Sequence, residues 1–388
     1  RITSVEIGPK TLTYHYEGDY LTSFIDAEGD EWVYGYDSHG FLSRVRTPEG
    51  HTKNTQTYND RGEVQEQTVG NSRSLNFDFD QDNNTMTVSD IWGNTTTHTH
   101  DSRYRLVAAE SALGYTETFK YDDDDNLIAY TDQAGNTWRY DYDENGNMIY
   151  RADPVDGTSY DRVDETRWRY DDENHVISMT NSLGYTTRYT YDEEGNRIHT
   201  YFPDGGVITN TYTSDGQIKT RTDQNGHTTT YEYYPNTGDL WKVIDPLGNT
   251  TTYEYDELGR KTAKIDANGN RTEFRYNGRD QVIKRIDSYG NSTRYRYDGD
   301  GRLTDEWDRN GAHTQYEYAE CCGLLTKKID PEGGVTEYGY NAMNLRVWMR
   351  DPNGNQTDYV YDEDYNLVGE IGPPPTPGAE RPHTYYFY

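Results

Sequence analysis

One unit of about 21 residues repeats along almost the whole chain, and this repeat constrains the fold more than any other feature. Each unit holds an aromatic residue, nearly always Tyr, just before a turn of the form Asp-x-x-Gly. We take this residue as the anchor of the unit. The anchors are Tyr16, Tyr36, Tyr58, Phe79, His100, Tyr121, Tyr142, Tyr170, Tyr191, Tyr212, Tyr233, Tyr255, Tyr276, Tyr297, Tyr318, Tyr340 and Tyr361. The spacing breaks only between Tyr142 and Tyr170, where we place a short insertion at about Val155 to Thr166.

A second turn of the form Asp-x-x-Gly lies between successive anchors. Asp at the first position and Gly at the fourth are typical of a type I turn. The glycines of these turns are Gly135, Gly226, Gly248, Gly269, Gly290, Gly311, Gly333 and Gly354. Residues alternate between the turns, with Tyr253 and Tyr255 on one face and Thr252 and Glu254 on the other. Two turns and two alternating strands predict one β-hairpin per unit.

The repeat therefore predicts an all-β chain of tandem hairpins. Seventeen hairpins contain roughly 34 strands, and a ribbon with ~4.8 Å per strand would be ~160 Å long. A twisted sheet of that length cannot stay flat, so we expect it to coil into a spiral or barrel-like shell. Residues 1–370 form this array. Residues 371–388 form a Pro-rich exit segment, which we expect to lead toward a further C-terminal region.

Composition agrees with the repeat and excludes several classes of protein. Hydrophobic residues make up only 32% of the chain and the net charge is −31, a balance that is usual for disordered chains. The 39 tyrosines contradict disorder, because disordered chains are poor in aromatic residues. An acidic surface repels phosphate backbones and anionic lipids, which disfavours nucleic-acid binding. No apolar run reaches the ~18 residues of a membrane span.

The unit resembles the YD repeat of Rhs proteins. The resemblance rests on the Tyr-Asp-x-x-Gly-Arg core at Tyr255 to Arg260, on Tyr297 to Leu303, and on the near match at Tyr191 to Arg197. The segment Tyr318-Ala-Glu-Cys-Cys-Gly-Leu-Leu325 is also similar to a stretch of bacterial Rhs proteins. The resemblance covers about Tyr16 to Leu367. Similar repeats occur in the C component of insecticidal toxin complexes, in bacterial wall-associated proteins and in teneurins.

This resemblance implies a β-cocoon around a hollow interior. In Rhs toxins the cocoon encloses a C-terminal toxin, and a self-cleaving segment that this sequence does not show separates the two. We therefore expect a non-enzymatic shell that encloses, carries or displays another polypeptide. We expect the protein to be secreted, exposed on a cell surface or delivered by a bacterial secretion system. The alternative is an extracellular adhesin or fibre that binds glycans or neighbouring cells, or that assembles with its own copies.

No residue pattern predicts a catalytic, cofactor or metal site. His98 and His100 could face the same side of a strand, but they stand where the next unit has Phe119 and Tyr121, so we interpret them as core substitutes. The acidic turn that starts at Asp141 copies the start of a calcium loop without its closing glutamate. Weak calcium association remains an alternative there.

Two adjacent cysteines, Cys321 and Cys322, replace turn residues after the Tyr318 anchor. We interpret them as reduced turn residues. A strained vicinal disulfide is the alternative.

Overall fold

The computed structural model describes residues 1–70, 73–154, 163–376 and 378–387, and every regular element within these ranges is a β-strand. Thirty-six strands are described, from β1 (Ser4–Ile7) to β36 (His383–Tyr385). Each strand pairs in antiparallel fashion with the next one along the chain. The predicted all-β fold of tandem hairpins is therefore confirmed. Across the described ranges there is no helix long and apolar enough to cross a membrane.

The strands from β2 to β35 fall into two sets, which alternate along the chain. The even-numbered strands among them run into an anchor, which is their last or second-to-last residue. They are β2 (Lys10–Glu17), β4 (Glu31–Tyr36), β6 (Thr52–Tyr58), β8 (Arg73–Asp80), β10 (Thr95–His100), β12 (Thr116–Tyr121), β14 (Thr137–Tyr142), β16 (Val163–Tyr170), β18 (Thr186–Tyr191), β20 (Val207–Tyr212), β22 (Thr228–Tyr233), β24 (Thr250–Tyr255), β26 (Arg271–Tyr276), β28 (Ser292–Tyr297), β30 (His313–Tyr318), β32 (Val335–Tyr340) and β34 (Gln356–Tyr361).

Odd-numbered strands return from the anchor turn to the turn between units. They are β3 (Tyr20–Ile25), β5 (Leu42–Arg46), β7 (Val64–Val69), β9 (Thr85–Asp90), β11 (Leu106–Glu110), β13 (Leu127–Thr131), β15 (Met148–Pro154), β17 (Val176–Thr180), β19 (Arg197–Tyr201), β21 (Ile218–Thr222), β23 (Leu240–Ile244), β25 (Lys261–Ile265), β27 (Val282–Ile286), β29 (Leu303–Trp307), β31 (Leu325–Ile329), β33 (Arg346–Arg350) and β35 (Leu367–Ile371).

Both turns of a unit are closed in the same way. In the anchor turn between β24 and β25, the Gly259 N–H donates to the Asp256 carbonyl at 3.0 Å. The Asp256 N–H donates in turn to the Arg260 carbonyl at 3.0 Å. Gly259 has φ +73°, in the left-handed region that a residue without Cβ enters freely. A type I turn followed by a left-handed residue closes a hairpin with a local bulge, and the β24–β25 register shifts next to this turn.

The sheet has no conventional core. Among the described hydrophobic residues, only Ala152, Ala263 and Met343 are buried. Aromatic rings instead pack against each other between neighbouring strands, as Phe119 and Tyr130 do with ring centroids 5.2 Å apart. Rings in contact bury large apolar areas without a closed interior, which explains how a chain so poor in aliphatic residues forms a single extended sheet.

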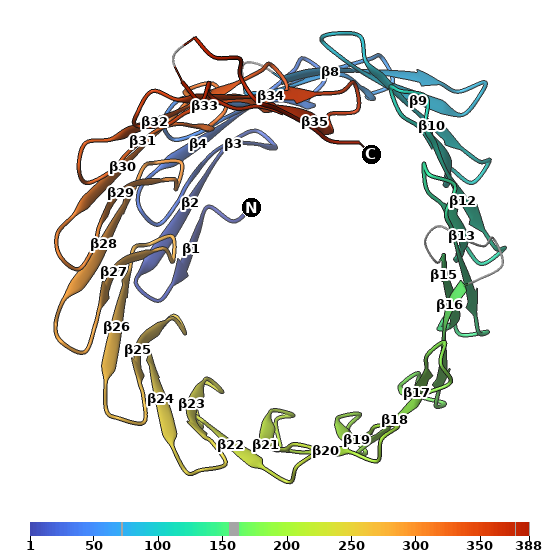
Figure 1. Cartoon of the computed structure of the whole chain (residues 1–388), viewed down its shortest axis with the longest axis vertical. Coiled ribbons are helices and arrows are strands. Elements are labelled where there is room, and N and C mark those ends of the chain that lie inside the picture. Colours follow the sequence, from blue (N-terminus) through green and yellow to red (C-terminus); the bar gives the residue numbers. More distant parts are fainter. Residues whose placement is uncertain (71–72, 155–162, 377, 388) are drawn as a thin grey trace.

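The sheet coils into a ring whose two ends overlap (Figure 1). The first strands, in blue, lie on the same side of the ring as the last strands, in orange and red. The turn between β3 and β4 contacts the turn between β26 and β27, so one winding takes 23 strands. The predicted coil is thereby confirmed, and the overlap makes the two windings one wall.

The structure describes the predicted insertion and the predicted Pro-rich exit segment only in part. Residues 155–162, the centre of the predicted insertion, lie outside the described residues, and β15 and β16 remain paired up to Pro154 and Val163. After the Pro-rich stretch, β36 pairs with β35, with Tyr385 opposite Gly369. The division of the chain at residue 370 remains a prediction.

Candidate functional site

The acids of the turns are engaged in local hydrogen bonds. Asp245 Oδ1 accepts the Leu247 N–H at 2.9 Å and the Asn249 N–H at 2.8 Å, and Oδ2 accepts the Asn249 amide at 2.8 Å. These bonds, led by that of the Asn249 side chain, lower the pKa of Asp245. The same three bonds recur at Asp266 and Asp287. Such carboxylates close turns, and both of their oxygens already accept hydrogen bonds within the turn.

Most anchor tyrosines tie their own hairpin to the preceding one. The Tyr255 hydroxyl donates to the Leu240 carbonyl at 3.0 Å, fifteen residues earlier and at the start of the preceding return strand. The equivalent bond is made by Tyr36, Tyr58, Tyr142, Tyr170, Tyr191, Tyr212, Tyr233, Tyr276, Tyr297, Tyr318, Tyr340 and Tyr361, at 2.7–3.0 Å. Phe79 and His100 have no hydroxyl for it. The bond explains why the repeat uses Tyr where packing alone would accept Phe.

The predicted turn glycines share one backbone conformation. All eight, from Gly135 to Gly354, have φ between +82° and +85°. They lie at the ends of the hairpins opposite the anchor turns. The repeat thus has two edges, an anchor-turn edge and an edge of the turns between units.

The histidines and acidic loops singled out in the sequence do not converge. His98 lies on β10 opposite Met86 and Ala109, and burial, followed by the nearby His100, lowers its pKa. Asp143, in the calcium-like loop, accepts two backbone N–H groups of its own turn. Within the described ranges, no group of three or more His, Cys, Asp or Glu side chains is arranged to hold a metal ion.

Cys321 and Cys322 are free thiols in the anchor turn after β30, with their sulfur atoms 2.7 Å apart. Burial and the contact with Cys322 raise the pKa of Cys321 to about 11. The turn lies against the first winding, because Gly70 packs on its backbone: a Cβ on Gly70 would lie 3.1 Å from the Cys322 Cα. The two cysteines are therefore part of a contact between windings.

This contact belongs to a seam that runs along the overlap of the two windings. Turns between units from the first winding dock on anchor turns of the second. Glu28 accepts the Gly278 N–H, and Glu49 accepts the Gly299 N–H at 2.7 Å. Further along, the Leu113 N–H donates to Asp364 at 3.3 Å. The first two contacts each join residues 250 apart, so the seam advances one hairpin at a time.

Charged and polar side chains also join the two windings along the seam. The Arg279 guanidinium donates to Asp26 at 2.6 Å and also contacts Asp30. The side chains of Arg279 and Asp26 are only 17% and 11% exposed. At the far end, the Tyr365 hydroxyl donates to Asp90 at 2.7 Å, and burial together with this bond raises the pKa of Tyr365 to about 12.

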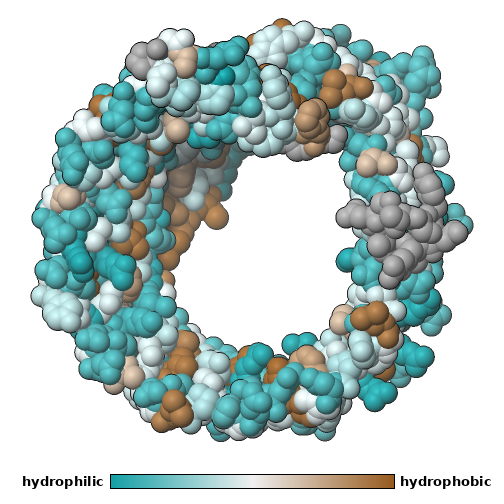
Figure 2. All heavy atoms as spheres, viewed as in Figure 1, coloured by the Kyte–Doolittle hydropathy of each residue, from teal (hydrophilic) through white to brown (hydrophobic). Residues whose placement is uncertain are grey.

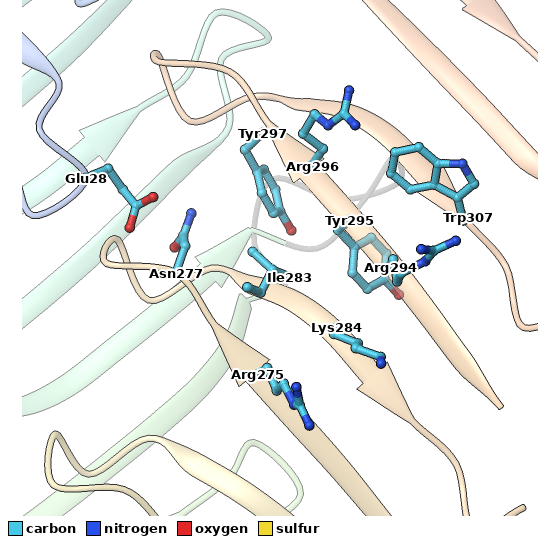
Figure 3. A pocket seen from close by; sticks show the side chains of 10 residues that line it. All are labelled: Glu28, Arg275, Asn277, Ile283, Lys284, Arg294, Tyr295, Arg296, Tyr297 and Trp307. Atoms are coloured by element: carbon cyan, nitrogen blue, oxygen red, sulfur yellow. The ribbon is translucent and has the colours of Figure 1, made fainter. Parts of the chain in front are cut away.

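The closed wall surrounds an opening that passes through the molecule (Figure 2). Hydrophilic residues cover most of the visible rim, and some apolar residues are visible on the inner wall. A surface cavity of about 560 Å³ lies on β26 to β29 (Figure 3). Its lining includes Arg275, Lys284, Arg294, Arg296 and Trp307.

The sequence did not point to the seam or to this cavity. Arg279 occupies a variable turn position, and nothing local marks it as the partner of Asp26 and Asp30, which lie 253 and 249 positions away. Both features depend on which strands meet, and that follows from the winding and the register.

Comparison with known proteins supports the fold. The RHS repeat family model matches residues 12–52, 121–158, 170–207 and 234–271. No curated protein sequence matches the chain. The Tc holotoxin pore of Photorhabdus luminescens, solved with a TccC3 variant, is similar over 94% of this chain at 15% identity and a TM-score of 0.68. A crystal structure of TcdB2-TccC3 aligns over 97% of this chain and 27% of its own, at 13% identity and a TM-score of 0.44.

This chain spans 23% of the matched holotoxin chain, so the likeness concerns its fold. The four matched stretches fall on the hairpin units defined by the anchors. The chain therefore carries RHS repeats, and the expected resemblance to RHS-repeat proteins is confirmed.

Proposed function

We propose that this chain is a non-enzymatic wall that encloses another polypeptide. The observation that carries the proposal is the seam. A coiled sheet with loose ends would be an open ribbon, whereas contacts such as Arg279–Asp26 and Tyr365–Asp90 join the two windings around a lumen. An enclosing function needs this closure, and an extended fibre does not.

The size of the ring suits a polypeptide better than a small ligand. With 23 strands per winding, the circumference is about 110 Å and the diameter about 35 Å for upright strands at ~4.8 Å spacing, and strand tilt widens both. Side chains on the inner face narrow the bore by roughly one sheet-to-sheet spacing of ~10 Å. The remaining space is far wider than a single extended chain.

The charge of the wall indicates what kind of guest it would hold. The chain carries 68 acidic and 37 basic residues, and carboxylates with an ordinary pKa are charged at neutral pH. A basic or partly unfolded polypeptide would be attracted to such a surface without a dry, shape-specific interface. The similar holotoxin pore supports a toxin as the guest and a place outside the producing cell, as proposals by analogy of fold.

Electron microscopy of the native particle, combined with protease protection, tests this function. We expect ring-shaped particles with density of a second polypeptide in the lumen. That polypeptide should resist protease until the wall is unfolded in denaturant. Rings that remain empty in the native source, or open polymers whose associated polypeptides are digested at once, would contradict enclosure. Open polymers that bind glycans would favour the adhesin alternative instead.

A further inference from the structure

Three cations lie side by side on one face of the wall. Strand pairing places Arg275 of β26 directly opposite Lys284 of β27, and Lys284 directly opposite Arg294 of β28. Arg294 pairs next with Trp307 of β29, and its guanidinium lies 5.4 Å from the centre of the Trp307 ring. Figure 3 shows these side chains on adjacent strands at the 560 Å³ cavity. We call Arg275, Lys284 and Arg294 the basic row.

The basic row has no acidic counterpart. In the described part of the chain, no carboxylate lies in ion-pair contact with any of its three cations. The acid that lines the cavity, Glu28, accepts the Gly278 N–H, and two further acids are paired, Glu273 with Arg271 at 2.9 Å and Asp305 with His313 at 2.8 Å. Arg296 lies 3.6 Å from Asp305, which it shares with that histidine.

The equivalent row two hairpins later has an arrangement of charges that stabilises the sheet. There Glu317, Lys327 and Glu337 occupy the same three positions on β30, β31 and β32, so that opposite charges alternate. Lys327 reaches Glu317 at 3.1 Å, and Glu337 pairs onward with Arg350 at 3.1 Å. Like charges directly opposite each other destabilise a sheet, whereas opposite charges stabilise it.

We propose that the basic row binds a compact multivalent oxyanion, a ligand that carries phosphate or sulfate groups. Three adjacent cations without ion-pair partners repel one another, and a bound anion would offset this repulsion even though the chain as a whole has a net charge of −31. Two guanidinium groups offer paired N–H donors that match tetrahedral oxyanions, and the lysine adds a point charge between them. The cavity in front of the row has the volume of a small-ligand site.

Spacing and charge argue against two larger ligands. Neighbouring strands place the cations ~4.8 Å apart, whereas side chains on one face of an extended peptide lie ~6.6 Å apart, so an acidic strand laid across the row would fall out of step. A long polyanion such as a nucleic acid would also meet the surrounding acidic wall. A short ligand stays within the local positive field, because salt screens the rest of the wall beyond ~8 Å.

Isothermal titration calorimetry of the full chain with sodium tripolyphosphate tests the proposal. We expect saturable binding that weakens as sodium chloride is raised, and at least tenfold weaker binding by Lys284→Gln. Lys327→Gln is the matched control, since it removes the central lysine of the alternating row, and it should bind as the unaltered chain does. Parallel titrations with sulfate and pyrophosphate distinguish the two sources of the anion, and saturable binding of either supports the site.

A second variant tests the proposal by its melting temperature, so the test does not depend on the detection of weak binding alone. Lys284→Glu restores alternation of charge, so we expect a higher melting temperature in anion-free buffer and no further rise on addition of tripolyphosphate. Absence of saturable binding by the unaltered chain, or equal losses in Lys284→Gln and Lys327→Gln, would overturn the proposal. So would tighter binding of an oligoglutamate peptide, or of single-stranded DNA, than of every phosphate and sulfate probe.

Discussion

At the scale of single residues, the anchor tyrosines join neighbouring hairpins through their hydroxyl groups as well as their rings. The Tyr255 hydroxyl meets the backbone carbonyl of Leu240, which would otherwise lack this donor. Each such bond contributes about 1 kcal/mol, because folding exchanges a bond to water for one within the protein. Because the bond recurs along the wall, these small contributions add up.

We predict that Tyr255→Phe lowers the free energy of unfolding by about 1 kcal/mol, since it removes one hydroxyl and leaves a carbonyl without its donor. Tyr253→Phe is the matched control on the same strand. The Tyr253 ring contacts the Lys261 ammonium, and the substitution keeps the ring. Urea unfolding followed by circular dichroism measures both. Equal effects of the two substitutions would show that the ring alone accounts for the anchor.

At the scale of elements, the seam depends on close approach between turns. Gly70 has φ +65° and packs against the backbone of Cys321 and Cys322, so a side chain there is excluded twice. Gly135 has φ +84° with no atom within 4 Å of an added Cβ. A comparison of substitutions at the two glycines therefore separates the effect of backbone strain from the effect of the contact between windings.

We predict that Gly70→Ala destabilises the chain more than Gly135→Ala does. Both substitutions carry a strain of roughly 1 kcal/mol for a left-handed residue, but only Gly70→Ala pushes the windings apart. Hydrogen exchange of the turns at residues 47–50 and 319–323 should rise in Gly70→Ala alone. Unchanged exchange in both variants would mean that this contact does not hold the seam.

The salt bridges of the seam allow a double-mutant cycle. Removal of Arg279 leaves the poorly exposed Asp26 without its partner, and removal of Asp26 leaves the poorly exposed Arg279 with Asp30 alone. We predict that Arg279→Gln and Asp26→Asn are each destabilising and that their coupling energy is about 1–3 kcal/mol. The exposed pair Arg350–Glu337, taken through the same cycle, should give below about 1 kcal/mol. Coupling energies of equal size at the two sites would contradict a special role for the seam.

Particular residues show how far sequence reasoning reaches at this scale. The anchors and turn glycines follow from the 21-residue spacing, because each strand and turn is specified by residues next to it. Arg279, Gly70 and the basic row could not be predicted in the same way. Their partners depend on a winding that accumulates a small twist at every hairpin, and on a strand register that turns and bulges shift by single residues.

At the scale of the whole molecule, the repeated turn aspartates couple stability to pH. Hydrogen bonds lower the pKa of Asp245, Asp266, Asp287 and Asp351 below the usual 3.8 in the folded chain. The stability that these groups contribute is therefore present above about pH 4, and it is lost as the pH falls through their folded pKa values. Many turns respond together.

Tyrosines with a raised pKa limit the stability of the chain at high pH. Burial and a hydrogen bond to a carboxylate raise the pKa of Tyr130 and Tyr365 from 10.0 to about 12, so the stability tied to their neutral form is lost as the pH rises between these values. We predict a plateau of melting temperature from pH 7 to 9, with steep losses below pH 4 and above pH 10. Thermal unfolding in a buffer series checks this, and a steady slope across pH 7 to 9 would contradict it.

Because its two ends overlap, the ring should stay closed after a single break in the chain. If a protease cuts the exposed turn at Leu183, which is 77% exposed, the two pieces remain joined by strand pairing beside the cut and by the seam across the ring. We expect the cut protein to migrate as two bands on a denaturing gel and as one intact particle in gel filtration. Arg279→Gln should let those pieces separate in milder denaturant. The ring should therefore keep its shape although the chain is broken at one point.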